Sequence, residues 1–248
     1  MTFKSDEVER YARHLVLREI GGPGQQALKA ARVLIVGAGG LGSPAALYLA
    51  AAGVGTLGIV DPDTVALSNL QRQVLYATDE IGRLKVDAAR DRLSALNPTI
   101  QIDSHAIEVT AANARQVIDG YDLVLDGTDD FATRFAVNAA CVAAGVPLVS
   151  GAIGRWTGQV GVFTGRPCYR CLVPAVPPEA ETCAAVGVVG ALGGVIGALM
   201  AMEAIKLICS AEESLTGRLL IYDALASETR TVRVGADPDC PVCGGHSG

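Results

Sequence analysis

Short apolar runs alternate with helical patterns through the first 150 residues of the chain. The run at 33–36 is rich in β-branched residues, which predicts a strand buried on both faces. Further strands are expected at 56–60, 100–107, 122–126 and 146–149, and helices at 41–52, 82–96, 112–118 and from Phe131 onward. Strands and helices that alternate in this way predict a parallel sheet with helices on its faces.

The pattern changes after Gly151. Strands are expected at 158–163, 219–222 and 229–234, separated by turns instead of helices, so they would extend the parallel sheet with antiparallel strands. No linker rich in proline or serine divides the chain. We therefore predict one α/β domain over 1–248, a Rossmann-like doubly wound sheet with three parts. These are a helical arm at 1–31, a parallel part at 32–150 and a mixed-sheet part at 151–248.

Residues 6–19 have the spacing of an amphipathic helix, which the glycines at 21–24 would end. Arg10, Arg13 and His14 share one face of this helix. The basic face either lies in solvent or presents an arginine to a phosphate, and the spacing is compatible with both.

Three glycines follow the first strand in a G-x-G-x-x-G pattern, at Gly37, Gly39 and Gly42. The first permits a tight turn, the second lets a phosphate approach the backbone, and the third lets the helix pack close to the strand. Asp61 ends the second strand, where an acidic side chain can accept hydrogen bonds from a ribose. Strand, helix, strand and acid together predict a nucleotide-binding site.

Two polar features are candidates for the same site. The loop at 63–73 would lie at the carboxyl end of a parallel strand, where open α/β sheets bind ligands. Lys85 lies in the first turn of a helix, where the helix dipole disfavours a cation. Residues that break a local rule in this way are often functional.

Asp126, Asp129 and Asp130 follow the fourth expected strand. Carboxylates so close together repel one another unless a cation or shared protons intervene. One of them could cap the helix that begins at Phe131, and another could hold Mg²⁺ beside the glycine turn. A cap by one aspartate does not exclude a metal at another.

Composition and charge exclude several classes of function. Half of the residues are hydrophobic and 19% are charged, and the net charge of −6 argues against nucleic acid as a partner. The charged first residues contain no apolar segment, which predicts a cytoplasmic protein. The stretch 182–202 has no charge and could cross a bilayer, but its glycines and its continuing helical pattern favour a buried helix and no membrane.

Four of the seven cysteines form two C-x-x-C pairs, Cys168 with Cys171 and Cys240 with Cys243. Two such pairs supply the four thiolates of a structural zinc site, which would fasten the end of the chain to the main domain. A redox role for one pair is the alternative, although neither pair opens a helix in a βαβ unit.

The remaining cysteines have different surroundings. Cys141 and Cys209 lie in apolar helical stretches and are expected to be small buried hydrophobes. Cys183 precedes a helix, where a thiol tends to have a lowered pKa and to be nucleophilic. Glu179 and Glu181 oppose that effect, so the sequence leaves the reactivity of Cys183 open.

Short motifs that carry a family resemblance run through nearly the whole chain. They are R-Y-x-R (10–13), G-x-G-G-L-G (37–42), D-x-D (61–63), S-N-L-Q-R (68–72), G-x-x-K (82–85), D-x-T-D (126–129), P-L-V-S-G (147–151), C-Y-R-C-L (168–172), T-C (182–183), A-M-E-A-I-K (201–206) and the last C-x-x-C. Together they resemble the MoeB/ThiF family of the ubiquitin-activating enzyme superfamily.

The resemblance implies an adenylyltransferase that uses ATP and Mg²⁺ and contains Zn²⁺. Such an enzyme would adenylate the C-terminal glycine of a ubiquitin-like sulfur-carrier protein of the MoaD or ThiS type, which ends in Gly-Gly, and release pyrophosphate. A weak carboxylate nucleophile attacks the α-phosphate, so positioning and cations matter more than a strong base. The resemblance also implies a homodimer.

Roles for individual residues follow from the resemblance. Asp61 would bind the ribose, Asp129 would hold Mg²⁺, and Arg13 would reach the triphosphate of the other subunit. The catalytic candidates are Arg13, Arg72, Lys85, Asp129 and Cys183. The implied nucleotide-binding set is Gly37, Gly39, Gly40, Gly42, Asp61, Asp63, Ser68, Asn69, Leu70, Gln71, Arg72, Lys85, Asp129 and Asp130.

Two departures from the family pattern, and two other functions, bear on this interpretation. Asp130 replaces the usual asparagine, and the chain ends after its last cysteine pair without a rhodanese-like domain, which predicts a separate sulfur donor.

An NAD-dependent dehydrogenase shares the glycine pattern and Asp61, and a non-catalytic scaffold could bind the carrier without activating it. The pathway served, whether molybdenum cofactor, thiamine, tRNA thiolation or cysteine, is open.

Overall fold

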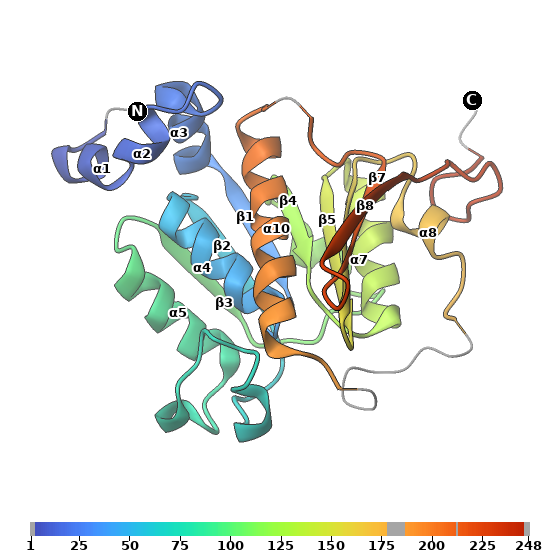
Figure 1. Cartoon of the computed structure of the whole chain (residues 1–248), viewed down its shortest axis with the longest axis horizontal. Helices are drawn as coiled ribbons and strands as arrows, with labels where there is room; N and C mark the ends of the chain where they lie inside the picture. Colours follow the sequence, from blue (N-terminus) through green and yellow to red (C-terminus); the bar gives the residue numbers. More distant parts are fainter. Residues whose placement is uncertain (1–2, 178–186, 212, 246–248) are drawn as a thin grey trace.

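A mixed sheet of eight strands crosses the computed structural model, which describes residues 3–177, 187–211 and 213–245 (Figure 1). The strand order is β3-β2-β1-β4-β5-β6-β7-β8. The parallel strands are β1 (Arg32–Val36), β2 (Thr56–Val60), β3 (Gln101–His105), β4 (Leu123–Asp126) and β5 (Leu148–Gly154). The antiparallel strands are β6 (Thr157–Phe163), β7 (Arg218–Asp223) and β8 (Glu228–Arg233). The predicted antiparallel extension of a parallel sheet is therefore confirmed.

Helices cover both faces of the sheet (Figure 1). One face packs against α3 (Gly21–Ala30), α4 (Gly42–Ala52), α5 (Lys85–Leu96) and α10 (Gly190–Ile208). The other packs against α6 (Ala114–Ile118), α7 (Phe131–Ala144) and α8 (Tyr169–Leu172). Along β1, Val33 and Ile35 enter the first apolar layer, whereas Leu34 and Val36 enter the second. This alternation is what a strand buried on both faces requires.

The N-terminal arm differs from the prediction of one helix over 6–19. It forms α1 (Ser5–Arg10) and α2 (Ala12–Leu15), and the glycines at 21–24 begin α3 instead of ending a helix. Tyr11 explains the break, because its side chain is buried and its hydroxyl accepts a hydrogen bond of 2.9 Å from Asn97. Long-range packing of Tyr11 thus outweighs the local helical pattern.

The long uncharged stretch contains α10, which packs against α4, β5 and β6. By length and composition alone α10 could cross a membrane, but 44% of its apolar window is buried inside the protein. A β-carbon at Gly193 would lie 2.7 Å from the carbonyl oxygen of Gly40, and one at Gly197 would lie 2.5 Å from that of Leu41. The glycines of α10 therefore allow the close approach of another element, as predicted.

We expect Gly197→Ala to lower the free energy of unfolding by about 1–3 kcal/mol, because the added methyl group must displace backbone of the neighbouring turn. Gly194→Ala is the matched control on the same helix, since no described atom lies within 4 Å of its β-carbon position. That change should instead stabilise the helix, by up to about 1 kcal/mol. Equal effects of the two substitutions in urea titrations would contradict this account of the packing.

Candidate active site

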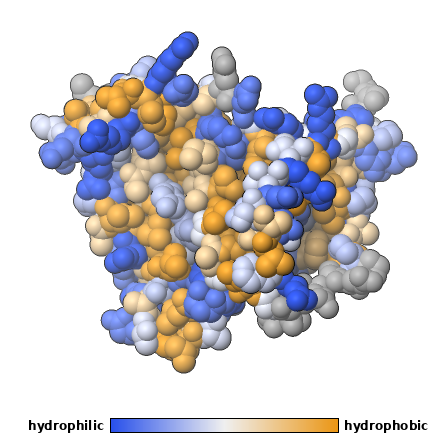
Figure 2. Space-filling model, in the orientation of Figure 1, coloured by the Kyte–Doolittle hydropathy of each residue, from blue (hydrophilic) through white to orange (hydrophobic). Residues whose placement is uncertain are grey.

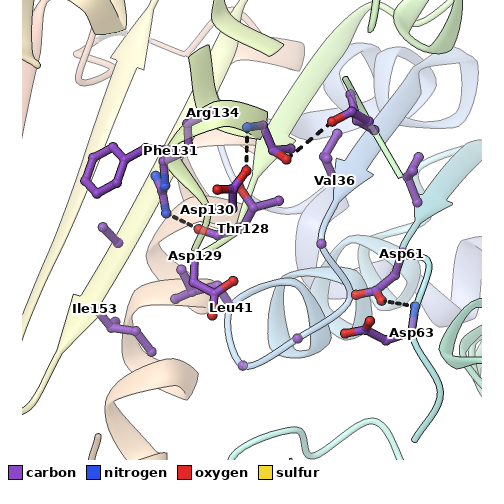
Figure 3. A pocket seen from close by; sticks show the side chains of 18 of the residues that line it. Val36, Leu41, Asp61, Asp63, Thr128, Asp129, Asp130, Phe131, Arg134 and Ile153 are labelled. Atoms are coloured by element: carbon purple, nitrogen blue, oxygen red, sulfur yellow. Dashed lines mark hydrogen bonds between the residues drawn. The ribbon is translucent and has the colours of Figure 1, made fainter. Parts of the chain in front are cut away.

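A cavity of about 800 Å³ opens where the parallel strands end (Figure 3). The glycine turn after β1 lies between two groups of acidic side chains, Asp61 and Asp63 on one side and Asp129 and Asp130 on the other. Ten residues of the nucleotide-binding set implied by the sequence line the cavity. They are Gly37, Gly39, Gly40, Asp61, Asp63, Asn69, Arg72, Lys85, Asp129 and Asp130.

The glycine turn is held in place from several sides. Gly37 has a φ of 89°, a conformation that favours glycine, and a β-carbon at Gly42 would collide with the carbonyl oxygen of Gly37. The Ala38 N–H donates to the Asp61 carboxylate at 2.9 Å, and the Ala38 carbonyl accepts from the Tyr76 hydroxyl at 2.8 Å. Burial raises the pKa of Tyr76, so this hydroxyl stays a donor. These contacts within the protein hold the turn in its conformation.

Lys85 is the first residue of α5, and its side chain is only 5% exposed. Its ammonium group lies 2.8 Å from an oxygen of Asp63 and 3.4 Å from one of Asp61. These two carboxylates compensate for the unfavourable position of a cation at a helix N-terminus. The lysine is thus fixed at the cavity wall, between the carboxyl end of β2 and the polar loop at 63–73.

The three clustered aspartates have three different environments. Asp126 is buried, accepts hydrogen bonds from the Thr128 hydroxyl and amide, and pairs with Arg134 at 3.5 Å. Asp130 caps α7, because its carboxylate accepts from the Thr133 N–H at 2.7 Å. That hydrogen bond is the main cause of the lowered pKa of Asp130. Asp129 is exposed at the cavity, and within the described residues no hydrogen bond or ion pair engages its carboxylate.

The two C-x-x-C pairs come together in one cluster. The four sulfur atoms of Cys168, Cys171, Cys240 and Cys243 lie within 4.8 Å of one another. The closest pairs are Cys168 with Cys240 at 3.6 Å and Cys171 with Cys243 at 3.3 Å. Tetrahedral zinc with bonds of about 2.3 Å needs sulfur atoms roughly 3.8 Å apart, so the donor set fits this metal.

Comparison with known proteins places the chain in a family. Residues 11–242 match the ThiF family. The chain belongs to the ThiF family. Its relatives include the sulfur carrier protein adenylyltransferase of Thermus thermophilus, which is 46% identical over 253 residues and is matched over 98% of this chain and 93% of its own length.

Two further similarities extend the comparison. The probable adenylyltransferase/sulfurtransferase MoeZ of Mycobacterium tuberculosis is 49% identical over 95% of this ThiF-family chain, which spans 62% of the length of MoeZ. Crystalline E. coli MccB with AMPCPP and MccA has a TM-score of 0.81 at 25% identity, over 95% of this chain and 74% of that one. This ThiF-family chain thus shares its overall fold with MccB.

Several candidates from the sequence lie away from the cavity in this ThiF-family chain. Gly42, Ser68, Leu70 and Gln71 do not line it, although the Ser68 carbonyl accepts a hydrogen bond from the Arg72 guanidinium at 3.0 Å. Leu70 instead packs against the apolar layer beneath α4 and α10. These residues shape the polar loop, which presents Asn69 and Arg72 to the cavity.

Arg13 is not brought to the cavity of its own chain. Arg13 is exposed on α2, at the opposite end of the sheet, where Tyr11 contacts the residues that precede β2 and β3. Cys183, Glu179 and Glu181 lie outside the described residues, so the prediction for the Cys183 thiol stays a prediction.

Cys141 is buried as predicted, and burial raises its pKa to about 12. Cys209 is partly buried.

The structure adds cavity residues that the sequence motifs did not single out. Gln73 is 4% exposed and lies beside Gly39, and its side-chain oxygen has no hydrogen-bond partner among the described residues. Arg134 and Tyr169 also line the cavity. Arg134 could have been noticed as a charged residue in an otherwise apolar helical stretch, whereas Gln73 and Tyr169 have no distinctive sequence signal.

Asp130→Ala should destabilise the protein by about 1 kcal/mol through loss of the α7 cap, while Asp130→Asn should stay within about 0.5 kcal/mol, since asparagine caps equally well. The folded-state pKa of Asp130 is lowered, so the contribution of its charge is complete above about pH 4 and is lost as pH falls through the folded pKa. Urea titrations between pH 3 and pH 7 measure both effects. A stability advantage of wild type over Asp130→Asn that grows towards pH 3 would contradict the assignment.

Gln73→Leu should leave the nucleotide-free protein at least as stable as wild type, because it removes a buried amide oxygen that lacks a donor. If a nucleotide supplies that donor, the same change weakens ATP binding by about five- to tenfold. Thermal unfolding with and without ATP separates the two effects. Gln116→Leu, at an exposed position of α6, is the control and should change neither.

Proposed function

We propose that this ThiF-family protein is an adenylyltransferase that activates the C-terminal glycine of a ubiquitin-like sulfur-carrier protein with ATP. The observation that carries the proposal is the cavity itself. It combines a fixed glycine turn, a buried lysine and the Asp129 carboxylate, which makes no hydrogen bond or ion pair with the residues that the structure describes, at one edge of the sheet. The name of the Thermus thermophilus relative supports the same reaction and the same class of substrate.

Each part of the cavity has a role in this reaction. The N–H groups of the glycine turn and the N-terminus of α4 suit phosphate oxygens. Asp61 keeps free lone pairs beside its bonds to Ala38 and Asp63, so it can accept from a ribose hydroxyl. The unengaged Asp129 carboxylate is the hard oxygen ligand that Mg²⁺ prefers. Mg²⁺ would neutralise charge on the phosphate oxygens.

The reaction needs little acid–base chemistry from the protein. A terminal carboxylate oxygen of the carrier attacks the α-phosphorus of ATP, the bond to the bridging oxygen breaks, and pyrophosphate leaves with the electron pair. Lys85 and Arg72 lie on the cavity wall, where positive charge stabilises the developing negative charge. Asp63 and Asp61 hold the Lys85 ammonium at this wall.

An NAD-dependent dehydrogenase is the less well supported alternative. It would account for the glycine turn and Asp61, but not for Lys85, Arg72 and Asp129 around one cavity. ATP with Mg²⁺ should raise the melting temperature more than NAD at equal concentration if the proposal is right.

A homodimer is part of the proposal, because Arg13 lies far from the cavity of its own chain. Apolar side chains reach the surface along α10, including Val195 at 41% and Met202 at 55% exposure (Figure 2). Such a surface suits contact with a second copy, whose arm could supply Arg13.

Zinc bound by the cysteine cluster would be structural, since four thiolates leave no position for water. We place the reaction in the cytoplasm.

We expect Lys85→Ala and Asp129→Ala each to lower carrier-dependent exchange of pyrophosphate into ATP by at least about 100-fold, because each removes charge that stabilises the transition state. Exchange is measured with labelled pyrophosphate and each candidate carrier of the MoaD or ThiS type. Arg90→Ala is the matched control, since Arg90 lies on α5 but pairs with Asp87 at the surface. Wild-type exchange rates in the Lys85 and Asp129 variants would refute these roles, and no exchange by wild type with any carrier would refute the function.

A further inference from the structure

Arg134 is a buried cation that no step of the proposed reaction uses. It lies on α7 beneath the loop that carries Asp129, and its side chain is 5% exposed (Figure 3). Burying a guanidinium is costly unless its charge is compensated and its N–H groups are hydrogen-bonded. Its contacts therefore need an explanation beyond the packing of α7.

The guanidinium ties together the two loops that end β4 and β5. One terminal nitrogen donates to the Ser150 hydroxyl at 3.1 Å and lies 3.5 Å from the Asp126 carboxylate. The other donates to the carbonyl oxygens of Gly151, at 2.7 Å, and Thr128. The Thr128 carbonyl belongs to the peptide group that leads into Asp129. Fixing this carbonyl therefore restricts the backbone from which the Asp129 side chain projects.

A second chain of contacts connects Arg134 to the cysteine cluster. The guanidinium carbon lies 5.9 Å from the centre of the Tyr169 ring, and Tyr169 stands between two of the cysteines. The Tyr169 N–H donates to Asn138 at 2.9 Å, and the Asn138 amide lies 3.6 Å from the Cys168 sulfur. Arg134 is thus held between the Asp129 loop and the wall built by α8.

The charges around Arg134 explain why a cation is required here. Burial alone would lower its pKa, but the Asp126 carboxylate, Tyr169 and the Asp129 carboxylate together outweigh that effect and raise it. Without the guanidinium, Asp126 would be an uncompensated buried carboxylate in the same short segment of chain as Asp129 and Asp130. Repulsion would then favour movement of the loop.

We propose that Arg134 is a positioning residue, which holds the Thr128–Asp129 peptide so that the Asp129 carboxylate faces the cavity in the geometry needed for Mg²⁺ with ATP. The inference rests on the proposed role of Asp129 and extends it to the residue beneath. The fork of the guanidinium is essential, because one terminal nitrogen donates to the carbonyl oxygens of Thr128 and Gly151 while the other faces Ser150 and Asp126. A lysine would keep the charge, but its single nitrogen could not make the contacts of both terminal nitrogens at once.

The test compares Mg²⁺-dependent ATP binding in Arg134→Lys and Asp129→Asn with wild type, by calorimetry, alongside adenosine binding without metal. Arg134→Lys should weaken binding of ATP with Mg²⁺ at least about tenfold and raise the Mg²⁺ concentration needed for half-maximal binding. Adenosine affinity should change less than about twofold, because adenosine does not need Mg²⁺. Arg115→Lys, at an exposed position of α6, is the control and should match wild type.

Folded Arg134→Lys protein with wild-type Mg²⁺ dependence would overturn the inference, provided that Asp129→Asn shifts that dependence. Equal weakening of ATP and adenosine would also overturn it, because it indicates a merely structural role. If Asp129→Asn itself has no effect, the proposed role of Asp129 fails instead. Should Arg134→Lys not fold, Ser150→Ala is the alternative variant. It removes one hydrogen-bond partner of the guanidinium, and Ser150 itself does not line the cavity. It should weaken Mg²⁺-dependent binding about two- to threefold, and unchanged binding would count against the inference.

Discussion

The close approach of several backbones around the glycine turn is the constraint on which the site depends. The turn after β1 lies against α10 and against the loop after β4, at distances where a β-carbon on Gly42 or Gly193 would collide with a neighbouring carbonyl oxygen. Asp61 and Tyr76 fix the peptide groups of the turn from its other side. Because these contacts form within the protein, a nucleotide would meet N–H groups that are already oriented, and little ordering free energy remains to be supplied by binding.

The charges at this edge of the sheet are sorted into pairs. Lys85 lies between two carboxylates, Arg134 compensates Asp126, and the cap of α7 engages Asp130. Clustered carboxylates repel one another, so each partner lowers the cost of keeping them together. The Asp129 carboxylate is left over at the cavity, among the residues that the structure describes. Because the cationic side chains of the site pair with the other carboxylates, Asp129 is the one that can bind a cation from solution.

Residues from the second half of the chain also form part of the cavity wall. The antiparallel strands β6–β8 continue the sheet beyond β5, and the cysteine cluster joins α8 to the end of the described chain. This junction holds the Tyr169 ring against Arg134 and forms part of the cavity wall. A structural metal in such a cluster would therefore stabilise more than a terminus, because the wall it supports contacts the loop that carries Asp129.

By itself, the sequence determined the elements of the sheet, the glycine turn, the acidic residue after β2 and the two cysteine pairs. Each of these rests on short-range spacing, such as the period of buried residues or the distance between glycines, and the family resemblance added roles for Lys85 and Asp129. Only the tertiary structure divided the three aspartates into a buried ion pair, a helix cap and a carboxylate that makes no hydrogen bond or ion pair with the described residues, since that depends on residues from β5 and α7. It also decided that Tyr11 breaks the first helix and that Gln73 and Arg134 reach the cavity, because contacts between residues far apart in the chain leave no periodic trace in the sequence.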